Sequence, residues 1–406
     1  MFYHGRFSLF IVRITLSLRG RAVQLFCGTR TNHRGNLMST SGVAIIGAGL
    51  GGLALAQGLK SHGISATVYE ADPAPDSRIQ GYRIRIDAQG QQALARVLPP
   101  ALYQLFRQTA SVASTEGRFL DRTGQQANGR QPEGWHRAEQ NPDLAPDLSI
   151  HRQTLREILM CGLEGALRYG HALEGYHQES EGRVGLRFAH TADASCQLLV
   201  GADGINSRVR TQLAPDAAPA DSGYLCLYGK SALTVEKALY EGTNVLFCDG
   251  FSAIIDEMRF RQDFTALAAK AGFNGSLTQT EDYLYWALIG PGSRLAVPLD
   301  SLSLPPMLQK LIQRTLPEHI ATLPVRYGNS NIVWQPGNVT LLGDAVHAMS
   351  PAGGIGANTA LRDAADLATA LHGKGLSGLA EYERLMLARG KAAVADSAVA
   401  AAKLSG

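Results

Sequence analysis

The sequence has little of what marks several classes of protein. Its five cysteines are scattered, odd in number and form no C-x-x-C pair. A disulfide framework and a zinc or other metal site are therefore not expected, and a reducing compartment fits. The apolar run at 7–18 is short and contains Arg13, so we expect no stable membrane span.

Acidic residues are absent from residues 1–37, which contain six arginines and no lysine. This segment resembles a mitochondrial transit peptide, but a non-structural extension that ends before Met38 is the preferred interpretation. Without those six arginines the net charge changes from +3 to −3. No basic patch favours nucleic-acid binding. We expect a cytoplasmic protein, or a mitochondrial one if the leader is used.

The 406 residues are 45% hydrophobic and 18% charged, which suits a globular enzyme with a sizeable core. The 44 glycines gather in a few motifs. The first motif lies in Val43–Asp72. There an apolar strand is followed by Gly47-Ala48-Gly49-Leu50-Gly51-Gly52, a helical stretch, and a second strand that ends at Glu70.

Each part of this motif has a physical role in binding a dinucleotide. Gly47 permits a tight turn, Gly49 lets a pyrophosphate approach the backbone, and Gly52 lets the helix pack close to the strand. The helix N-terminus offers free N–H groups to phosphates. Glu70 can accept hydrogen bonds from ribose hydroxyls, and it disfavours a 2′-phosphate. The motif predicts a dinucleotide site but does not separate FAD from NAD.

Two later segments repeat the pattern of a strand, a tight turn and a helix. The run 196–200 leads to Asp203-Gly204, and Val339–Leu342 leads to Gly343-Asp344 and a glycine-rich loop that ends at Asn358. Asp344 can accept hydrogen bonds from a polyol such as ribityl. Backbone N–H groups of Gly356–Asn358 can face a carbonyl-rich ring.

Strand patterns and aromatic residues dominate the region between these segments. From about residue 214 to 330 we expect a sheet-rich region with helical pieces at 263–271 and 306–316. Its tyrosines and phenylalanines suit an apolar pocket for an aromatic substrate, although core packing explains any single one of them better.

The three motifs in this order resemble the class A flavoprotein monooxygenases, typified by p-hydroxybenzoate hydroxylase. Those proteins share G-x-G-x-x-G, an Asp-Gly motif, and a Gly-Asp motif followed by P-x-x-G-x-G-x-N, here Pro351, Gly354, Gly356 and Asn358. The resemblance covers residues 43–372. It implies an α/β fold with a Rossmann-like FAD-binding domain and an inserted sheet-rich (α+β) substrate domain. The expected divisions are a disordered extension at 1–41, FAD-binding parts at 42–213 and 331–406, and a substrate domain at 214–330.

The resemblance also implies the cofactor contacts. In this interpretation Glu70 holds the adenosine ribose, Gly81 and Arg152 contact FAD, and Asp203 contacts FAD and helps to position the nicotinamide. For Arg152 a purely local capping role is the alternative. The full set of expected cofactor-binding positions is Gly47, Gly49, Leu50, Gly52, Glu70, Gly81, Arg152, Asp203, Asp344, Gly356, Ala357 and Asn358.

The implied reaction is hydroxylation of an aromatic or polyketide-type small molecule with NAD(P)H and O2, through a C4a-hydroperoxide of FAD. No second G-x-G-x-x-G is present, so no separate NAD(P)H domain is expected. No catalytic base can be named, and His347 is expected to pack beside the cofactor. A monomer or a homodimer is expected.

Three alternatives remain open from the sequence. A flavin-dependent reductase or dehydrogenase of the same fold would form product without oxygen. A halogenase would carry W-x-W-x-I-P, which the text at 285–289 does not match. A non-catalytic flavin- or ligand-binding relative would turn over no substrate.

Overall fold

The computed structural model describes residues 41–77, 81–113, 117–127, 145–233, 242–261, 263–273, 277–329 and 331–405. The expectations for residues 1–37 therefore lie outside the described part of the chain. Among the described residues, no helix combines the length and the apolar character that crossing a bilayer requires.

The first sheet is built around β1 (Ser41–Ile46), whose residues are apolar enough to be buried between two parallel neighbours. It pairs with β2 (Ala66–Tyr69) and β9 (Ala194–Gly201). The other strands are β6 (Leu167–Arg168), β7 (Leu173–Gln178), β8 (Val184–Phe188) and β15 (Val339–Leu341), in the order β6-β2-β1-β9-β8-β7 with β15 also beside β9. The strand β8 pairs antiparallel with both β7 and β9.

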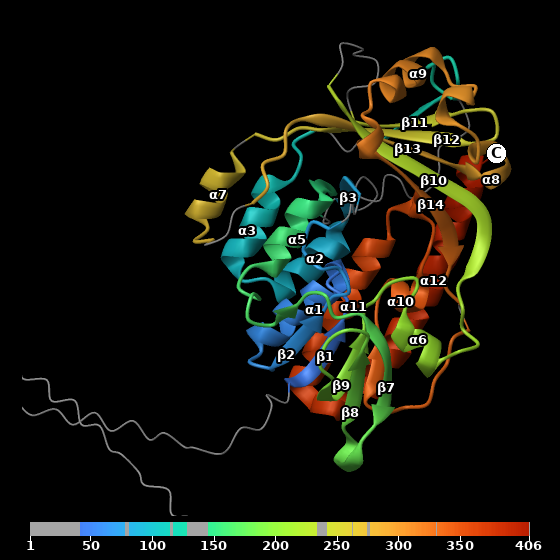
Figure 1. Ribbon diagram of the computed structural model, residues 1–406. Helices are drawn as coiled ribbons and strands as arrows, with labels where there is room; N and C mark the ends of the chain where they lie inside the picture. Colours follow the sequence, from blue (N-terminus) through green and yellow to red (C-terminus); the bar gives the residue numbers. More distant parts are fainter. Residues whose placement is uncertain are drawn as a thin grey trace, which may run out of the picture. The chain divides into compact units, whose positions relative to one another are not determined.

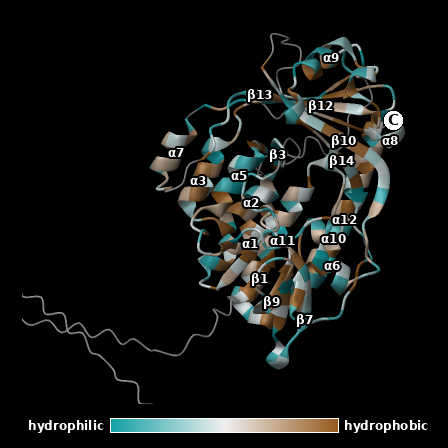
Figure 2. Ribbon diagram, viewed as in Figure 1, coloured by the Kyte–Doolittle hydropathy of each residue, from teal (hydrophilic) through white to brown (hydrophobic). Residues whose placement is uncertain are grey.

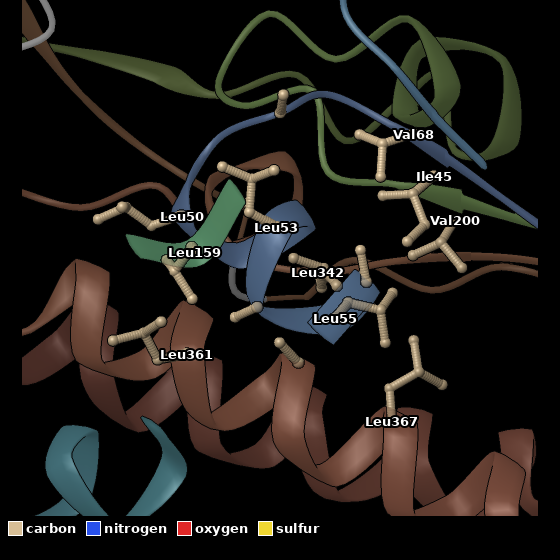
Figure 3. Close-up of a cluster of buried hydrophobic side chains, with 14 of the residues drawn as sticks. Ile45, Leu50, Leu53, Leu55, Val68, Leu159, Val200, Leu342, Leu361 and Leu367 are labelled. Atoms are coloured by element: carbon tan, nitrogen blue, oxygen red, sulfur yellow. The ribbon is translucent and has the colours of Figure 1, made fainter. Parts of the chain in front are cut away.

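Two helices cover one face of this sheet. The helix α1 (Leu50–Ser61) lies between the strands and α11 (Gly356–Lys374), and Figure 3 shows Leu53 and Leu55 between the strand residues and Leu361 and Leu367. The close approach depends on glycine in α1. A Cβ at Gly51 would lie 2.7 Å from Leu342 Cδ1, and one at Gly58 would lie 2.7 Å from Ala368 Cβ. The glycines therefore let the layers pack closely.

The second sheet is mostly antiparallel and has two buried faces. Its order is β14-β10-β13-β12-β11-β4, and the strands β10 to β14 are labelled in the upper part of Figure 1. The bounds are β4 Gly117–Leu120, β10 Ala220–Ala232, β11 Thr243–Phe247, β12 Ser252–Met258, β13 Tyr283–Pro291 and β14 Ile320–Tyr327. Alternate residues serve opposite faces: Leu227 and Trp286 pack against α9 (Pro306–Gln313), whereas Tyr228 and Ala287 face the other cluster. Figure 2 shows hydrophobic residues along β12 and β13.

A short pair of strands lies apart from both sheets. The strand β3 (Arg83–Ile86) pairs with β5 (Leu148–His151) in an antiparallel ribbon. The remaining helices are α2 (Ala88–Val97), α3 (Pro100–Thr109), α5 (Arg152–Met160), α6 (Arg208–Leu213), α7 (Phe264–Lys270), α8 (Gly292–Leu295), α10 (Asp344–His347) and α12 (Leu379–Ser405). The C-terminal end of α12 packs on the second sheet, where Leu404 joins the apolar cluster of Ile289 and Val325.

Candidate functional site: a groove between strand ends

Three glycines in the turn after β1 and in the first turn of α1 have different surroundings. Gly47 has φ +106°, and a Cβ there would overlap the carbonyl oxygen of Ala202. A Cβ at Gly52 would overlap the carbonyl oxygen of Gly47. Gly49, by contrast, has no heavy atom within 4 Å of a built Cβ. The turn therefore packs on two sides and leaves open space at Gly49, while the side chain of Leu50 lies in the core.

Glu70 directly follows β2, and hydrogen bonds connect it to the same turn. Its Oε2 accepts a hydrogen bond of 2.8 Å from the Ala48 N–H, and its Oε1 accepts one of 3.0 Å from the Asp72 N–H. The side chain is 7% exposed. Each carboxylate oxygen can accept more than one hydrogen bond, so these contacts orient Glu70 and leave acceptor capacity for a ligand.

Asp203 follows β9 and caps the helix α6. Its Oδ1 accepts a hydrogen bond of 2.5 Å from Ser207 Oγ, and its Oδ2 accepts one of 2.7 Å from the Arg208 N–H. Burial raises the pKa of Asp203. Its position after β9 matches the sequence prediction, but the contacts of its carboxylate are those of a helix cap.

Gly81 and Arg152 meet where the β3–β5 ribbon begins. Gly81 has φ +95°, and a Cβ there would lie 3.6 Å from Arg152 Cδ. The Arg152 N–H donates a hydrogen bond of 3.4 Å to the Tyr82 carbonyl oxygen, and Arg152 begins α5. The arginine is thus held beside the glycine by main-chain contacts.

The Gly343–Asp344 turn faces the N-terminus of α11. Gly343 has φ +62°, Asp344 is exposed, and no side chain among the described residues caps α11 at Ile355. A Cβ at Gly356 would lie 3.9 Å from Asp344 Oδ1, so these two predicted residues are neighbours. Asp344 and the start of α11, including Ala357, therefore present an acceptor and helix N–H groups to one space.

The side chain of Asn358 connects two segments of the chain that are far apart in the sequence. Its Oδ1 accepts a hydrogen bond of 3.1 Å from the Asp87 N–H, and its Nδ2 donates to the carbonyl oxygens of Arg85 and Gly354 at 3.0 Å each. The side chain is 5% exposed. It holds β3 against α11, so only its main chain is left for a ligand.

Two cavities place these residues along one groove. A cavity of 740 Å³ is lined by Gly47, Gly49, Glu70 and Asp203, and one of 440 Å³ by Gly81, Asp344, Gly356 and Ala357. Arg152 and Asn206 line both cavities. These ten positions, which are far apart in the sequence, thus line two adjoining cavities that together reach from Glu70 to the second sheet.

The wall of the 440 Å³ cavity that belongs to the second sheet is mainly apolar and aromatic. The residues that form it are Cys226, Tyr228, Ile254, Tyr285, Ala287, Ile289, Leu323, Pro324, Val325 and Arg326. Burial raises the pKa of Tyr228 and of Tyr285, which keeps both phenols neutral and able to donate hydrogen bonds. This wall suits a flat apolar molecule with a few polar groups.

Sequence reasoning missed a buried charge network behind the Gly343 turn. Asp363 Oδ2 is 2.5 Å from His347 Nε2 and accepts a hydrogen bond of 3.1 Å from the Gly343 N–H. Asp363 Oδ1 accepts hydrogen bonds from Arg389 Nη2 at 2.7 Å and Nε at 3.2 Å. One signal in the sequence could have indicated this network. Asp363 lies four residues before Leu367, so its carboxylate is on the apolar side of α11. His347 therefore forms an ion pair behind the turn.

The protonation of this network follows from its contacts. Burial lowers the pKa of His347, but the charge and hydrogen bond of Asp363 raise it to above its ordinary value. Burial raises the pKa of Asp363, but His347 and Arg389 lower it to below its ordinary value. The network therefore holds the Gly343 turn through charged hydrogen bonds.

Known proteins match both the sequence and the fold. The model of the FAD binding domain family matches residues 40–225 and 318–400. The dual O-methyltransferase/FAD-dependent monooxygenase of Phaeosphaeria nodorum is 33% identical in an alignment of 372 positions, and this alignment covers 80% of this chain and 39% of that protein. The chain thus spans less than half the length of this relative.

Solved structures of other proteins match the fold of this chain. A candidate FAD-containing monooxygenase of Photorhabdus luminescens is 28% identical with a TM-score of 0.73, covering 89% of this chain and 98% of its own. HpxO of Klebsiella pneumoniae, solved with FAD and uric acid, is 21% identical with a TM-score of 0.71, covering 90% of this chain and 89% of its own, and shows the shared fold.

The chain belongs to the FAD binding domain family, and FAD is its cofactor. The predicted fold class, an α/β FAD-binding fold combined with a sheet-rich second region, is confirmed. The domain boundaries stay a prediction, and β4 adds residues before 214 to the second sheet.

Proposed function

We propose that this protein is an FAD-dependent monooxygenase that hydroxylates an aromatic or polyketide-type small molecule with NAD(P)H and O2. The observation that carries the proposal is the shared lining of the two cavities by Arg152 and Asn206. A long dinucleotide can extend through such a groove from Glu70 to the aromatic wall. The family membership supports the same activity.

The residues fit FAD in the following way. Glu70 would accept the ribose hydroxyls, the open space at Gly49 and the start of α1 would receive the pyrophosphate, and Asp344 would accept the ribityl hydroxyls. The N–H groups of Gly356–Asn358 would face the isoalloxazine. Arg152, Gly81 and Asp203 would contact the middle of the cofactor, since they line the groove between these ends.

Reduced FAD supplies the activation of O2, and the protein supplies orientation and exclusion of water. The aromatic wall would hold the substrate flat against the Asp344 end of the groove. Tyr228 and Tyr285 would donate hydrogen bonds to substrate oxygens from neutral phenols.

The first experiment tests the cofactor placement. Gly49→Val fits the fold because no atom lies within 4 Å, but it fills the space that we assign to the pyrophosphate. We expect FAD affinity to fall roughly a hundredfold, about 2.7 kcal/mol, with an unchanged unfolding midpoint of the apoprotein. Gly165→Val is the matched control, because Gly165 also has open space. Equal FAD affinity in the two variants would contradict the placement.

The second experiment tests the activity. Purified protein is given a panel of phenols, and NAD(P)H oxidation, O2 uptake and hydroxylated product are measured. Product that needs O2 supports the proposal. Product formed without O2 would favour a reductase or dehydrogenase, and no turnover with bound FAD would favour a non-catalytic relative.

We further propose a monomer or homodimer located in the cytoplasm, or in mitochondria if residues 1–37 direct import. Gel filtration with light scattering and cell fractionation test these two points. Partners other than a small molecule are not part of the proposal.

A further inference from the structure

The cavity face of β10 continues beyond the cavity to a lysine. Alternate residues of a strand lie on one face, so Cys226, Tyr228 and Lys230 follow one another on the same side of β10. Cys226 and Tyr228 line the 440 Å³ cavity. Lys230 is half-buried and lies one strand repeat further on.

The ammonium group of Lys230 contacts aromatic rings in place of carboxylates. Its Nζ is 5.1 Å from the centroid of the Tyr82 ring and 5.8 Å from that of Tyr283. Burial lowers the pKa of Lys230, and the more distant Glu281 partly offsets this. No carboxylate of a described residue lies within salt-bridge distance of this nitrogen. Two ring faces stabilise a cation less than a carboxylate hydrogen bond does.

Tyr82 joins this lysine to the cavity. Tyr82 lines the cavity and is 5% exposed, and its hydroxyl is buried without a hydrogen-bond partner among the described residues. Burial, with Tyr228 and Glu318, raises the pKa of Tyr82 to about 12, so the phenol is a neutral donor. The His319 ring meets the Tyr82 ring edge-on at 6.0 Å. Burial and Lys230 lower the pKa of His319.

Three of the arginines that line the cavity already have polar partners. Arg83 forms an ion pair with the buried Asp256, and Arg85 Nε is 2.5 Å from Asp147 Oδ2. Arg326 Nη1 donates a hydrogen bond of 3.0 Å to Asn206 Oδ1. Lys230 differs from these three arginines, since it offers a positive charge and three donors that the described chain does not use.

We propose that Lys230, Tyr82 and His319 form a subsite that binds an anionic oxygen of the substrate, so that the substrate is an acidic aromatic compound with a carboxylate or a readily ionised enol or phenol. Such an oxygen would accept hydrogen bonds from the ammonium group and the buried phenol together. It would fix one end of the substrate while the aromatic wall holds its ring. This inference rests on the proposed function, because it places the substrate in that cavity.

The test measures binding to the oxidised holoenzyme without turnover. The probes are 3-hydroxy-2-naphthoate and its methyl ester, which share a ring system and differ in charge. Binding of each probe is measured by the absorbance change of the flavin. We expect the wild type to bind the acid roughly tenfold or more tighter than the ester, the scale of one charged hydrogen bond. Lys230→Met should remove this difference, Lys230→Arg should keep part of it, and Tyr82→Phe should weaken only the acid.

Lys310→Met is the matched control, because Lys310 lies on α9 against the opposite face of the sheet. It should bind both probes as the wild type does. Acid binding no tighter than that of the ester, including binding of neither, would overturn the subsite. Equal weakening of both probes by Lys230→Met would overturn it too.

The same preparations separate this inference from the proposed function. Lys230-dependent acid binding without NAD(P)H oxidation on any phenol keeps the subsite and overturns the monooxygenase. Oxygen-dependent product formation from neutral phenols, with no preference for the acid, keeps the monooxygenase and overturns the subsite.

Discussion

The region behind the Gly343 turn and the region around Lys230 treat buried charge in opposite ways. Asp363 is fully buried, and His347, Arg389 and the Gly343 N–H all donate hydrogen bonds to it. Lys230, by contrast, contacts ring faces, beside a Tyr82 hydroxyl without a partner. A saturated network fixes the backbone that faces the cofactor, whereas unused donors are what a binding subsite requires. The difference separates the part that holds its own shape from the part that is ready for a ligand.

The largest effect is expected from breaking the saturated network. Asp363→Asn removes the charge that pairs with His347 and Arg389, and we expect the apoprotein to lose about 3 kcal/mol of unfolding free energy. The value lies at the low end for a broken buried pair, because His347 can lose its proton and Arg389 keeps a 3.0 Å contact with Asp366. Urea unfolding measures it. Asp366→Asn, at a more exposed site, should cost less than about 1 kcal/mol, and equal losses would remove the contrast.

The second effect is a pH dependence of the unfolding free energy, which arises from His151 near Lys230. Burial and the nearby Lys230 lower the pKa of His151 to about 4, from 6.5. When the pKa of a histidine is lower in the folded than in the unfolded protein, the protein loses stability as the pH falls from the unfolded pKa toward the folded pKa. Between pH 7 and pH 5 this linkage amounts to about 2 kcal/mol.

Urea unfolding of the wild type and of His151→Gln at pH 7 and pH 5 checks this value. The variant should lose less stability on acidification by that amount. His347 should act in the opposite direction, since its pKa is raised and its contribution decreases as the pH rises. Parallel pH profiles for the wild type and His151→Gln would show that His151 is not buried in neutral form.

The smallest expected effect is a gain in stability, whereas the two changes above are losses. Tyr82→Phe removes a buried hydroxyl without a partner, so stability should stay equal or rise by about 1 kcal/mol. Thermal unfolding of the apoprotein measures the change. Tyr283→Phe is the control, because its hydroxyl donates a hydrogen bond of 2.6 Å to the Tyr82 carbonyl oxygen and its loss should destabilise. A destabilised Tyr82→Phe would mean that the hydroxyl has a partner in the folded protein.

The glycine-rich turns could be predicted from sequence because their physics is local. The order of strand, turn and helix requires glycine at two positions. Gly47 has φ +106°, and a Cβ at Gly52 would overlap the carbonyl oxygen of Gly47. The strands of the second sheet also follow from local alternation. The helix α3 begins at Pro100, because proline fits the first turn of a helix even though it ends a helix elsewhere.

Contacts between distant segments could not be predicted in the same way. Asn358 bonds to Asp87 across 271 residues, and the partners of Asp363 come from three different helices and turns. Each is an ordinary polar residue in its own segment.

The sequence by itself determined the three strand ends, their glycines and the family to which the chain belongs, because each motif is a short stretch whose geometry depends on its own residues. The tertiary structure alone decided which charges are neutralised, since pairing depends on distance in space. That is why Arg83 and Arg85 have carboxylate partners, whereas Lys230 lies against aromatic rings.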